Sequence, residues 1–216
     1  MSDMTFRNLT GARRRASWDR RRERGVTLLE LCVVLAILMI VGGMLFISAG
    51  TAVQNIRLHQ SATSYANLLQ QARMRAVQDN RYYTVLTSIG NASSTAFVDL
   101  AGSGSYAAGD PMMVFSRSVN PMPFNSGPGL TGLKSLFLPT GEAAQGSVNT
   151  TTPGPTFGPR GLPCTPNGGT CPYLTPTSYI AFLQNSQSTK WEAVTVTPAG
   201  RIRIWAYDGR SWSPLN

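Results

Sequence analysis

The chain of 216 residues has few of the residues on which enzymes rely. It contains one histidine, His59, and ten acidic residues against 19 basic ones. It has no phosphate-binding G-x-x-x-x-G-K-[ST] loop and no G-x-S-x-G nucleophile elbow, and its acids form no cluster in the sequence. We therefore predict a protein that is not an enzyme and uses no cofactor or metal, with His59 facing solvent on a helix.

Cysteine is also scarce, with three in the chain. Cys164 and Cys171 flank six residues in PCTPNGGTCP. Two thiols without a nearby histidine or acid cannot complete a tetrahedral metal site. The pair instead predicts a disulfide-closed loop, the usual arrangement outside the cytoplasm. Cys32 lies in an apolar segment and is expected to act as a small apolar residue.

Positive charge is concentrated at one end of the chain. The formal net charge is +9. Residues 1–25 hold eight arginines and three acids and so carry +5, which leaves +4 for the other 191 residues. The basic composition alone is therefore weak evidence for nucleic-acid binding, and a basic surface has to be argued from local pattern.

Residues 31–47 contain no charged side chain. As a helix, this run and the apolar residues before it are long enough to cross a bilayer, and the preceding arginines would stay in the cytoplasm. A secretory signal, a lipoprotein signal and a plain anchor are alternatives. None of them explains Glu30, because a carboxylate at the end of a membrane helix costs a few kcal/mol and usually has a partner or a function.

The segment Arg24-Gly25-Val26-Thr27-Leu28-Leu29-Glu30, followed by an apolar helix, resembles the class III leader of type IV pilins and pseudopilins. The resemblance implies that a prepilin peptidase cuts between Gly25 and Val26 and methylates the new amine. It also implies that Glu30 of an incoming subunit pairs with the amine of its neighbour. Val26 departs from the usual Phe or Met. A local explanation for Glu30 is a capping box with Thr27.

The helix is predicted to continue to Asp79-Asn80. Small or apolar residues recur there with a spacing of three and four, which predicts one buried stripe. The stripe consists of Leu58, Ala62, Tyr65, Leu69, Ala72 and Ala76, with Arg57, Gln60, Gln71, Arg75 and Asp79 off it. The segment LLQQARMRAVQDNR also resembles the helix end of the GspH/FimT branch of pseudopilins.

After the helix the pattern changes to short β-type segments. We expect strands at residues 82–89, 95–100, 112–116, 134–138, 179–183, 193–196 and 201–207, separated by long connections at 101–110, 120–132 and 139–176. Loops of that length in a compact domain are either functional or mobile.

The most informative stretch is VTVTPAGRIRIWAYDGRSW. Residues 197–200 form a β-turn signal, and the strand after it alternates faces. Ile202, Ile204 and Ala206 would point into the core. The other face would carry two arginines and two aromatic residues, able to contact phosphates and stack on bases. These are Arg201, Arg203, Trp205 and Tyr207, with Arg210 and Lys190 as further candidates.

A plain explanation for the two arginines is protection of an edge strand against aggregation. However, Gly200-Arg201-Ile202-Arg203 resembles the GRxR motif that carries DNA binding in FimT-type minor pilins. Two hypotheses therefore stand. One is a FimT-like minor pilin that binds DNA weakly during natural transformation. The other is a GspH-like pseudopilin of the type II protein secretion system with a structural, protein-contacting role.

Both hypotheses imply the same α+β, type IV pilin-like organisation. Residues 1–25 would be a cleaved cytoplasmic leader, 26–50 a transmembrane helix, 51–80 an amphipathic stalk helix and 81–216 a periplasmic antiparallel β-sheet domain. The expected location is the bacterial inner membrane and then a filament. The implied partners are other major and minor pilins or pseudopilins, the prepilin peptidase, the inner-membrane assembly platform and DNA.

Overall fold

The computed structural model describes residues 26–90, 93–138, 144–146, 154–165 and 177–215. The chain divides into two units, residues 1–44 and residues 45–216. The described part of the first unit is the beginning of helix α1 (Leu28–Gln78), where the side chains of residues 26–41 are all exposed. Within the described residues, no helix is both long enough and apolar enough to cross a membrane.

The second unit contains the C-terminal part of α1, and the predicted stripe on it is confirmed. Its six residues are at most 2% exposed, whereas the five residues predicted off the stripe are all exposed. The helix ends where the sequence predicts. Asn80 takes a positive φ of 53°, and the Arg81 N–H donates to the Ala76 carbonyl at 3.1 Å. This bond is the 6→1 bond of a Schellman motif, which satisfies a carbonyl at the helix end.

Two sheets accompany this part of α1. The first, sheet A, has the strand order β3 (Met112–Val114), β2 (Thr95–Asp99), β1 (Tyr83–Ser88), β6 (Thr156–Phe157) and β7 (Pro163–Cys164). The second, sheet B, has the order β11 (Trp212–Leu215), β10 (Ile202–Tyr207), β9 (Trp191–Val196), β8 (Ser178–Asn185) and β4 (Val119–Met122). All these pairs are antiparallel, and β5 (Ala144–Gly146) adds to β8 in parallel.

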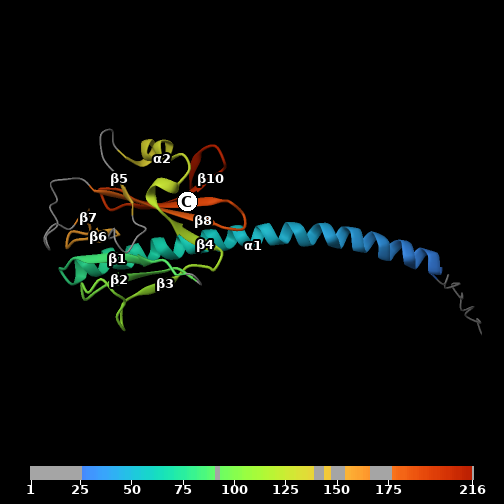
Figure 1. Ribbon diagram of the computed structural model, residues 1–216, viewed down its shortest axis with the longest axis horizontal. Coiled ribbons are helices and arrows are strands. Elements are labelled where there is room, and N and C mark those ends of the chain that lie inside the picture. The colour runs from blue at the N-terminus through green and yellow to red at the C-terminus, as the bar shows by residue number, and fades with distance from the viewer. Residues whose placement is uncertain (1–25, 91–92, 139–143, 147–153, 166–176, 216) are drawn as a thin grey trace, which may run out of the picture. The chain divides into compact units, whose positions relative to one another are not determined.

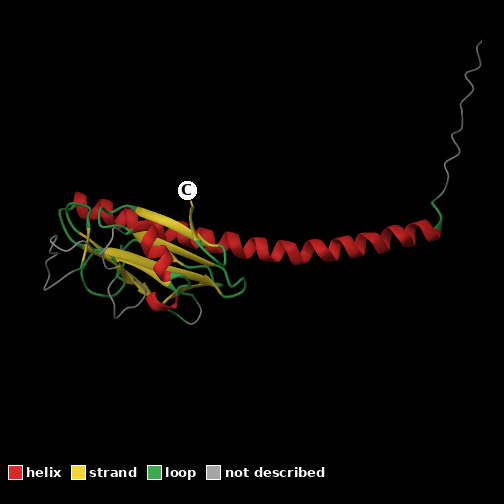
Figure 2. Cartoon of the chain, turned by 90° about the horizontal axis from the view of Figure 1, so that it is seen from above, coloured by secondary structure: helices red, strands yellow, loops and turns green. Residues whose placement is uncertain are grey.

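The main core lies where α1 and the two sheets meet (Figure 1). A second core lies on the opposite face of sheet B, under helix α2 (Leu130–Phe137) and the short 3-10 helix η1 (Phe124–Ser126). Strand β8 serves both cores, because Tyr179 and Ala181 face the first and Ile180 and Phe182 face the second. Figure 2 shows the strands gathered along the C-terminal part of the long helix.

The connection predicted at residues 101–110 is closed by two buried aspartates. Asp99 accepts the N–H groups of Ser103 and Gly104 at 3.0 and 2.7 Å. Asp110 accepts those of Leu100 and Ala107 at 3.3 and 2.9 Å. Because their oxygens are used by the backbone, these acids hold the loop in shape.

The predicted α+β class, with a long N-terminal helix packed against mainly antiparallel sheets, is confirmed. One predicted strand is wrong, because residues 134–137 belong to α2 and Leu138 is the C-cap of that helix. The connection predicted at 120–132 contains most of β4, the 3-10 helix η1 and the first residues of α2, and the connection predicted at 139–176 contains β5, β6 and β7. Strand β11 was not predicted at all.

Candidate functional site

The turn between β9 and β10 has the predicted hairpin geometry. The Gly200 N–H donates to the Thr197 carbonyl at 2.8 Å, and the Thr197 N–H donates to the Arg201 carbonyl at 2.9 Å. The Thr197 hydroxyl also accepts the Arg201 N–H at 3.1 Å. Gly200 has a φ of +76°, which suits a hairpin loop that ends in a left-handed residue. The turn therefore fixes where the GRxR residues enter the strand.

An arginine of α1 holds this turn from outside the hairpin. Arg73 Nη1 donates to the Gly200 carbonyl oxygen at 2.9 Å. A Cβ on Gly200 would lie 2.7 Å from the Gly161 carbonyl oxygen, closer than real contacts allow. The packing around Gly200 therefore requires a glycine at this position of the GRxR sequence, whether or not the motif binds DNA. Sequence reasoning missed Arg73, although it lies four residues after Leu69 and so borders the buried stripe.

The two arginines after the turn lie at a small hollow beside α1. Arg201 is exposed and Arg203 is half-buried. Both line a cavity of about 300 Å³ together with Asn67 and Gln70 of the helix. Guanidinium and amide groups are the donors that contact phosphate oxygens in protein–DNA complexes. This set of four residues, called the arginine hollow below, is a candidate phosphate-binding site.

Trp205 is not part of an exposed surface, and the prediction that it stacks on bases is wrong. Its side chain is 2% exposed, and its Nε1 donates to the Thr195 hydroxyl at 2.8 Å. It belongs to the second core, which α2 covers. Tyr207 is half-buried and packs against Trp212, with ring centroids 5.1 Å apart. The part of the β10 face that carries Trp205 is therefore covered by α2, whereas Arg201 and Arg203 on the same face stay accessible at the arginine hollow.

The opposite face of β10 agrees better with the prediction. Ile202 and Ile204 pack against the main core. Ala206 is half-buried and lines a different cavity. The strand is also not a free edge over its whole length, because β11 pairs with it from Ile204 onward. Edge protection thus explains at most the first residues of β10, next to the turn.

Lys190 and Arg210 do not extend the arginine hollow. Trp191, next to Lys190, pairs with Tyr207 at the far end of the hairpin. At about 3.3 Å per residue, that end lies roughly 20 Å along the strand from Arg201. Arg210 belongs to the β10–β11 connection, where the backbone N–H groups of Ser211 and Arg210 hold the pKa of Asp208 below its ordinary value.

The N-terminal residues show a local capping bond. Thr27 Oγ1 accepts the Glu30 backbone N–H at 3.2 Å, as in the first half of a capping box. The side chains of Val26 and Glu30 are both exposed. Because the cap uses the backbone of Glu30, its carboxylate is not needed for this bond. Gly25 lies outside the described residues.

Cys164 is buried in β7 and is disulfide-bonded. Cys171 lies outside the described residues, so the Cys164–Cys171 pairing stays a prediction. Cys32 is a free, exposed cysteine on α1. Among the described residues, no three histidine, cysteine or acidic side chains come close enough to hold a metal ion.

His59 is half-exposed on α1, in line with the prediction, but it also has a partner that the sequence did not reveal. Its Nδ1 lies 3.5 Å from Glu192 Oε2, and the Glu192 side chain is 9% exposed. Burial raises the pKa of the Glu192 carboxyl, and the nearby His59 opposes part of that rise. No local sequence signal pairs these two residues, because they are brought together only by the packing of α1 on sheet B.

The family model described as "Prokaryotic N-terminal methylation motif" matches residues 20–46. The chain carries a pilin-like N-terminus. This match spans Glu30 and the predicted cut site between Gly25 and Val26, and it confirms the predicted resemblance of the N-terminus to a prepilin-type leader. No curated protein matches the chain. The minor pseudopilin EpsH from the type 2 secretion system of Vibrio cholerae is a similar solved structure, with 12% identity and a TM-score of 0.41, covering 71% of this chain and 99% of that one.

Proposed function

We propose that this pilin-like chain is a minor pilin or pseudopilin of the GspH/FimT type, built into a type IV filament machine through its N-terminal helix. The observation that carries the proposal is the methylation motif at residues 20–46, joined to a helix that packs on β-sheets. The leader would be cut between Gly25 and Val26, and residues 26–50 would anchor the subunit in the inner membrane. Residues 51–80 would form the stalk and residues 81–216 the periplasmic domain, with a place at the filament tip.

We further propose that the arginine hollow binds DNA weakly and without sequence preference. Arg201 and Arg203 lie beside Asn67 and Gln70, and none of the described residues that line this cavity is aromatic. Contacts would therefore be made to phosphates and not to base faces. Two phosphate contacts give a salt slope of about −2 in a logarithmic plot and an affinity that depends on several subunits acting together.

Gel retardation tests this proposal on the full chain purified in detergent. The wild type should retard DNA at low salt, and Arg201→Gln with Arg203→Gln should not. The matched control is Arg57→Gln with Arg210→Gln, which removes the same charge from two exposed arginines outside the hollow and should retard DNA as the wild type does. Because Trp205 is buried, single-stranded DNA should gain no advantage over duplex. Equal retardation by both double variants would remove the DNA assignment.

The alternative is a GspH-like pseudopilin of the type II secretion system that contacts other subunits and does not bind DNA. One observation favours it. Gly200 is required by the packing against Gly161 and Arg73, so this part of the GRxR sequence is explained without DNA. A strain lacking the gene distinguishes the two functions, since loss of transformation supports the first and loss of protein secretion supports the second.

A further inference from the structure

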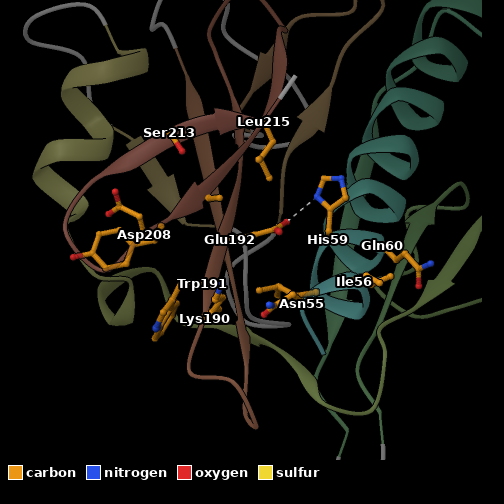
Figure 3. A pocket seen from close by; sticks show the side chains of 13 residues that line it. Asn55, Ile56, His59, Gln60, Lys190, Trp191, Glu192, Asp208, Ser213 and Leu215 are labelled. Atoms are coloured by element: carbon orange, nitrogen blue, oxygen red, sulfur yellow. Dashed lines mark ion pairs between the residues drawn. The ribbon is translucent and has the colours of Figure 1, made fainter. Parts of the chain in front are cut away.

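A second and larger cavity lies between α1 and the edge of sheet B, at the far end of the β9–β10 hairpin from Gly200. Its volume is about 690 Å³. Figure 3 shows residues of α1 on one side of it and residues of sheet B, among them Glu192 and Leu215, on the other. It takes no part in the DNA-binding proposal, because Arg201 and Arg203 are absent from its lining.

The walls of this cavity are mainly apolar and include Ile56, Leu58, Trp191, Ala206, Tyr207 and Leu215. The carboxylate of Glu192 lies among them. Its Oε2 atom is buried and accepts no hydrogen bond from the residues that the structure describes. His59 Nδ1 lies 3.5 Å from it and forms an ion pair with it only when the imidazole is protonated. A buried carboxylate so incompletely paired is costly for folding, which favours a functional reason for its presence.

Two other charged residues line the cavity, and neither replaces Glu192 as its acidic centre. Asp208 is exposed, and its carboxylate oxygens already accept bonds from Arg210 and Ser211. Lys190 is exposed as well. A bound cation would therefore meet the Glu192 carboxylate next to apolar walls. The positive charge of Lys190, which also lines the cavity, would weaken the binding of that cation.

We propose that this cavity binds an ammonium or guanidinium group carried on an aliphatic stem, with Glu192 as the counter-ion. The stem would lie against Ile56, Trp191 and Leu215, and the cationic group would replace His59 beside the carboxylate. Lysine and arginine side chains have this chemistry, with an apolar stem and a charged end, and so do free alkylamines. A mostly apolar cavity with one well-placed polar group is the usual form of a site for such a ligand.

The charge requirement is tested on the full chain in detergent, by following the NMR signal of the Trp191 indole N–H. Pentylammonium and pentan-1-ol are each titrated into the protein. The alcohol has the same five-carbon stem without the positive charge. Pentylammonium should bind at least about tenfold more tightly, as expected for a charge-assisted bond. Equal binding of the two compounds, or no shift with either, would overturn the proposal, and this comparison needs no variant to fold.

Three variants locate the charge. Glu192→Gln keeps the side-chain shape and should weaken pentylammonium binding about tenfold. Asp79→Asn removes an exposed acid just after the C-terminal end of α1, which does not line the cavity, and should leave binding unchanged. Lys190→Gln should tighten binding, because it removes a like charge from the cavity. Equal losses in Glu192→Gln and Asp79→Asn would show a general charge effect and would overturn the site.

A second probe distinguishes a protein side chain from a free alkylamine as the natural ligand. This probe, Nα-acetyl-lysine N-methylamide, presents a lysine side chain on a peptide backbone. Binding as tight as that of pentylammonium would support a side chain of another protein chain. Binding of pentylammonium with exclusion of the capped lysine would support a free alkylamine. If neither probe binds the wild type, the proposal fails while the DNA-binding function stays untouched, because none of the four residues of the arginine hollow lines this cavity.

Discussion

Gly200 occupies a conformation and a space that other residues do not fit. Its φ is +76°, and a Cβ there would lie 2.7 Å from the Gly161 carbonyl oxygen, which belongs to the backbone and cannot move aside cheaply. We expect Gly200→Ala to lower the free energy of unfolding by about 1–3 kcal/mol. Urea denaturation of the full chain in detergent measures it.

The matched control for this substitution is Gly132→Ala in α2. Gly132 is exposed, and a Cβ there has no neighbour within 4 Å. In a helix, alanine is favoured over glycine by roughly 0.5–1 kcal/mol, so this variant should be slightly more stable than the wild type. If both variants lost the same stability, the close approach of Gly161 to Gly200 would not be what requires the glycine.

Glu192 makes stability depend on pH in a defined direction. Burial raises its pKa above the ordinary value of 4.5, and the opposing effect of His59 is smaller. The folded state therefore binds the proton more tightly than the unfolded state does. The free energy of unfolding should fall as the pH rises from about 4 through the raised pKa. In Glu192→Gln this fall should be absent, so that the variant gains stability relative to the wild type above that range.

Denaturation midpoints measured over a pH series check this expectation. Asp79→Asn is the control, because Asp79 is an exposed acid that follows the C-terminal end of α1. Its carboxylate accepts a hydrogen bond from the Tyr83 hydroxyl in sheet A, whereas Glu192 lies in β9 of sheet B. A variant Glu192→Gln with the same pH profile as the wild type would mean that the buried carboxyl does not control stability there.

Helix α2 is the element that most changes the interpretation of the candidate site. It packs on sheet B through Leu133, which is fully buried, and partly through Leu130 and Phe137. Leu133→Ala should lower the free energy of unfolding by about 2–5 kcal/mol. Leu136→Ala, in the same helix, is the control because Leu136 is 51% exposed and should change stability by less than about 0.5 kcal/mol. Chemical denaturation measures both, and equal effects would mean that α2 does not cover the sheet.

How far the elements could be predicted depends on how much of their pattern is local. The stripe on α1 extends over several turns, and the long strands β1, β8, β9 and β10 have a clear β composition, so their existence was predicted correctly. Strands β6 and β7 have two residues each, too few to show any period. For α2 the signal was present and was misread, because Leu130, Leu133 and Phe137 are spaced for a helix face.

In the candidate site, too, the sequence predicts the features that follow from neighbouring residues but not the contacts between residues far apart in the chain. The turn at Gly200 and the alternation along β10 follow from local sequence and were predicted. The burial of Trp205, the Arg73–Gly200 bond and the Glu192–His59 pair join residues far apart in the chain, and no local pattern specifies them. Alternation indicates which side chains share a face, but only the packing of α2 decides whether that face is open.

At the scale of the whole molecule, the proposed function depends on how Glu30 behaves when subunits assemble. After cleavage, the amine of Val26 would carry a charge in or near the membrane. Leaving such a charge without a partner costs about 3–5 kcal/mol when it is buried. The helix cap uses the Glu30 backbone N–H and therefore survives removal of the side chain. Glu30→Ala should thus be cleaved normally but enter filaments at least about tenfold less efficiently.

Two measurements, made on the wild type and on each variant, distinguish an effect on leader cleavage from an effect on filament assembly. Mass spectrometry of the membrane-extracted subunit should find a methylated chain that begins at Val26 in the wild type and in Glu30→Ala. Immunoblots of sheared filaments should show the variant depleted. Thr27→Val serves as the control, because it removes the capping hydroxyl and keeps the carboxylate, and should lower helix stability by only about 0.5–2 kcal/mol while assembly continues. Normal assembly of Glu30→Ala would refute the pairing of this carboxylate with a neighbour's amine, and a mature chain that begins elsewhere would refute the cleavage site itself.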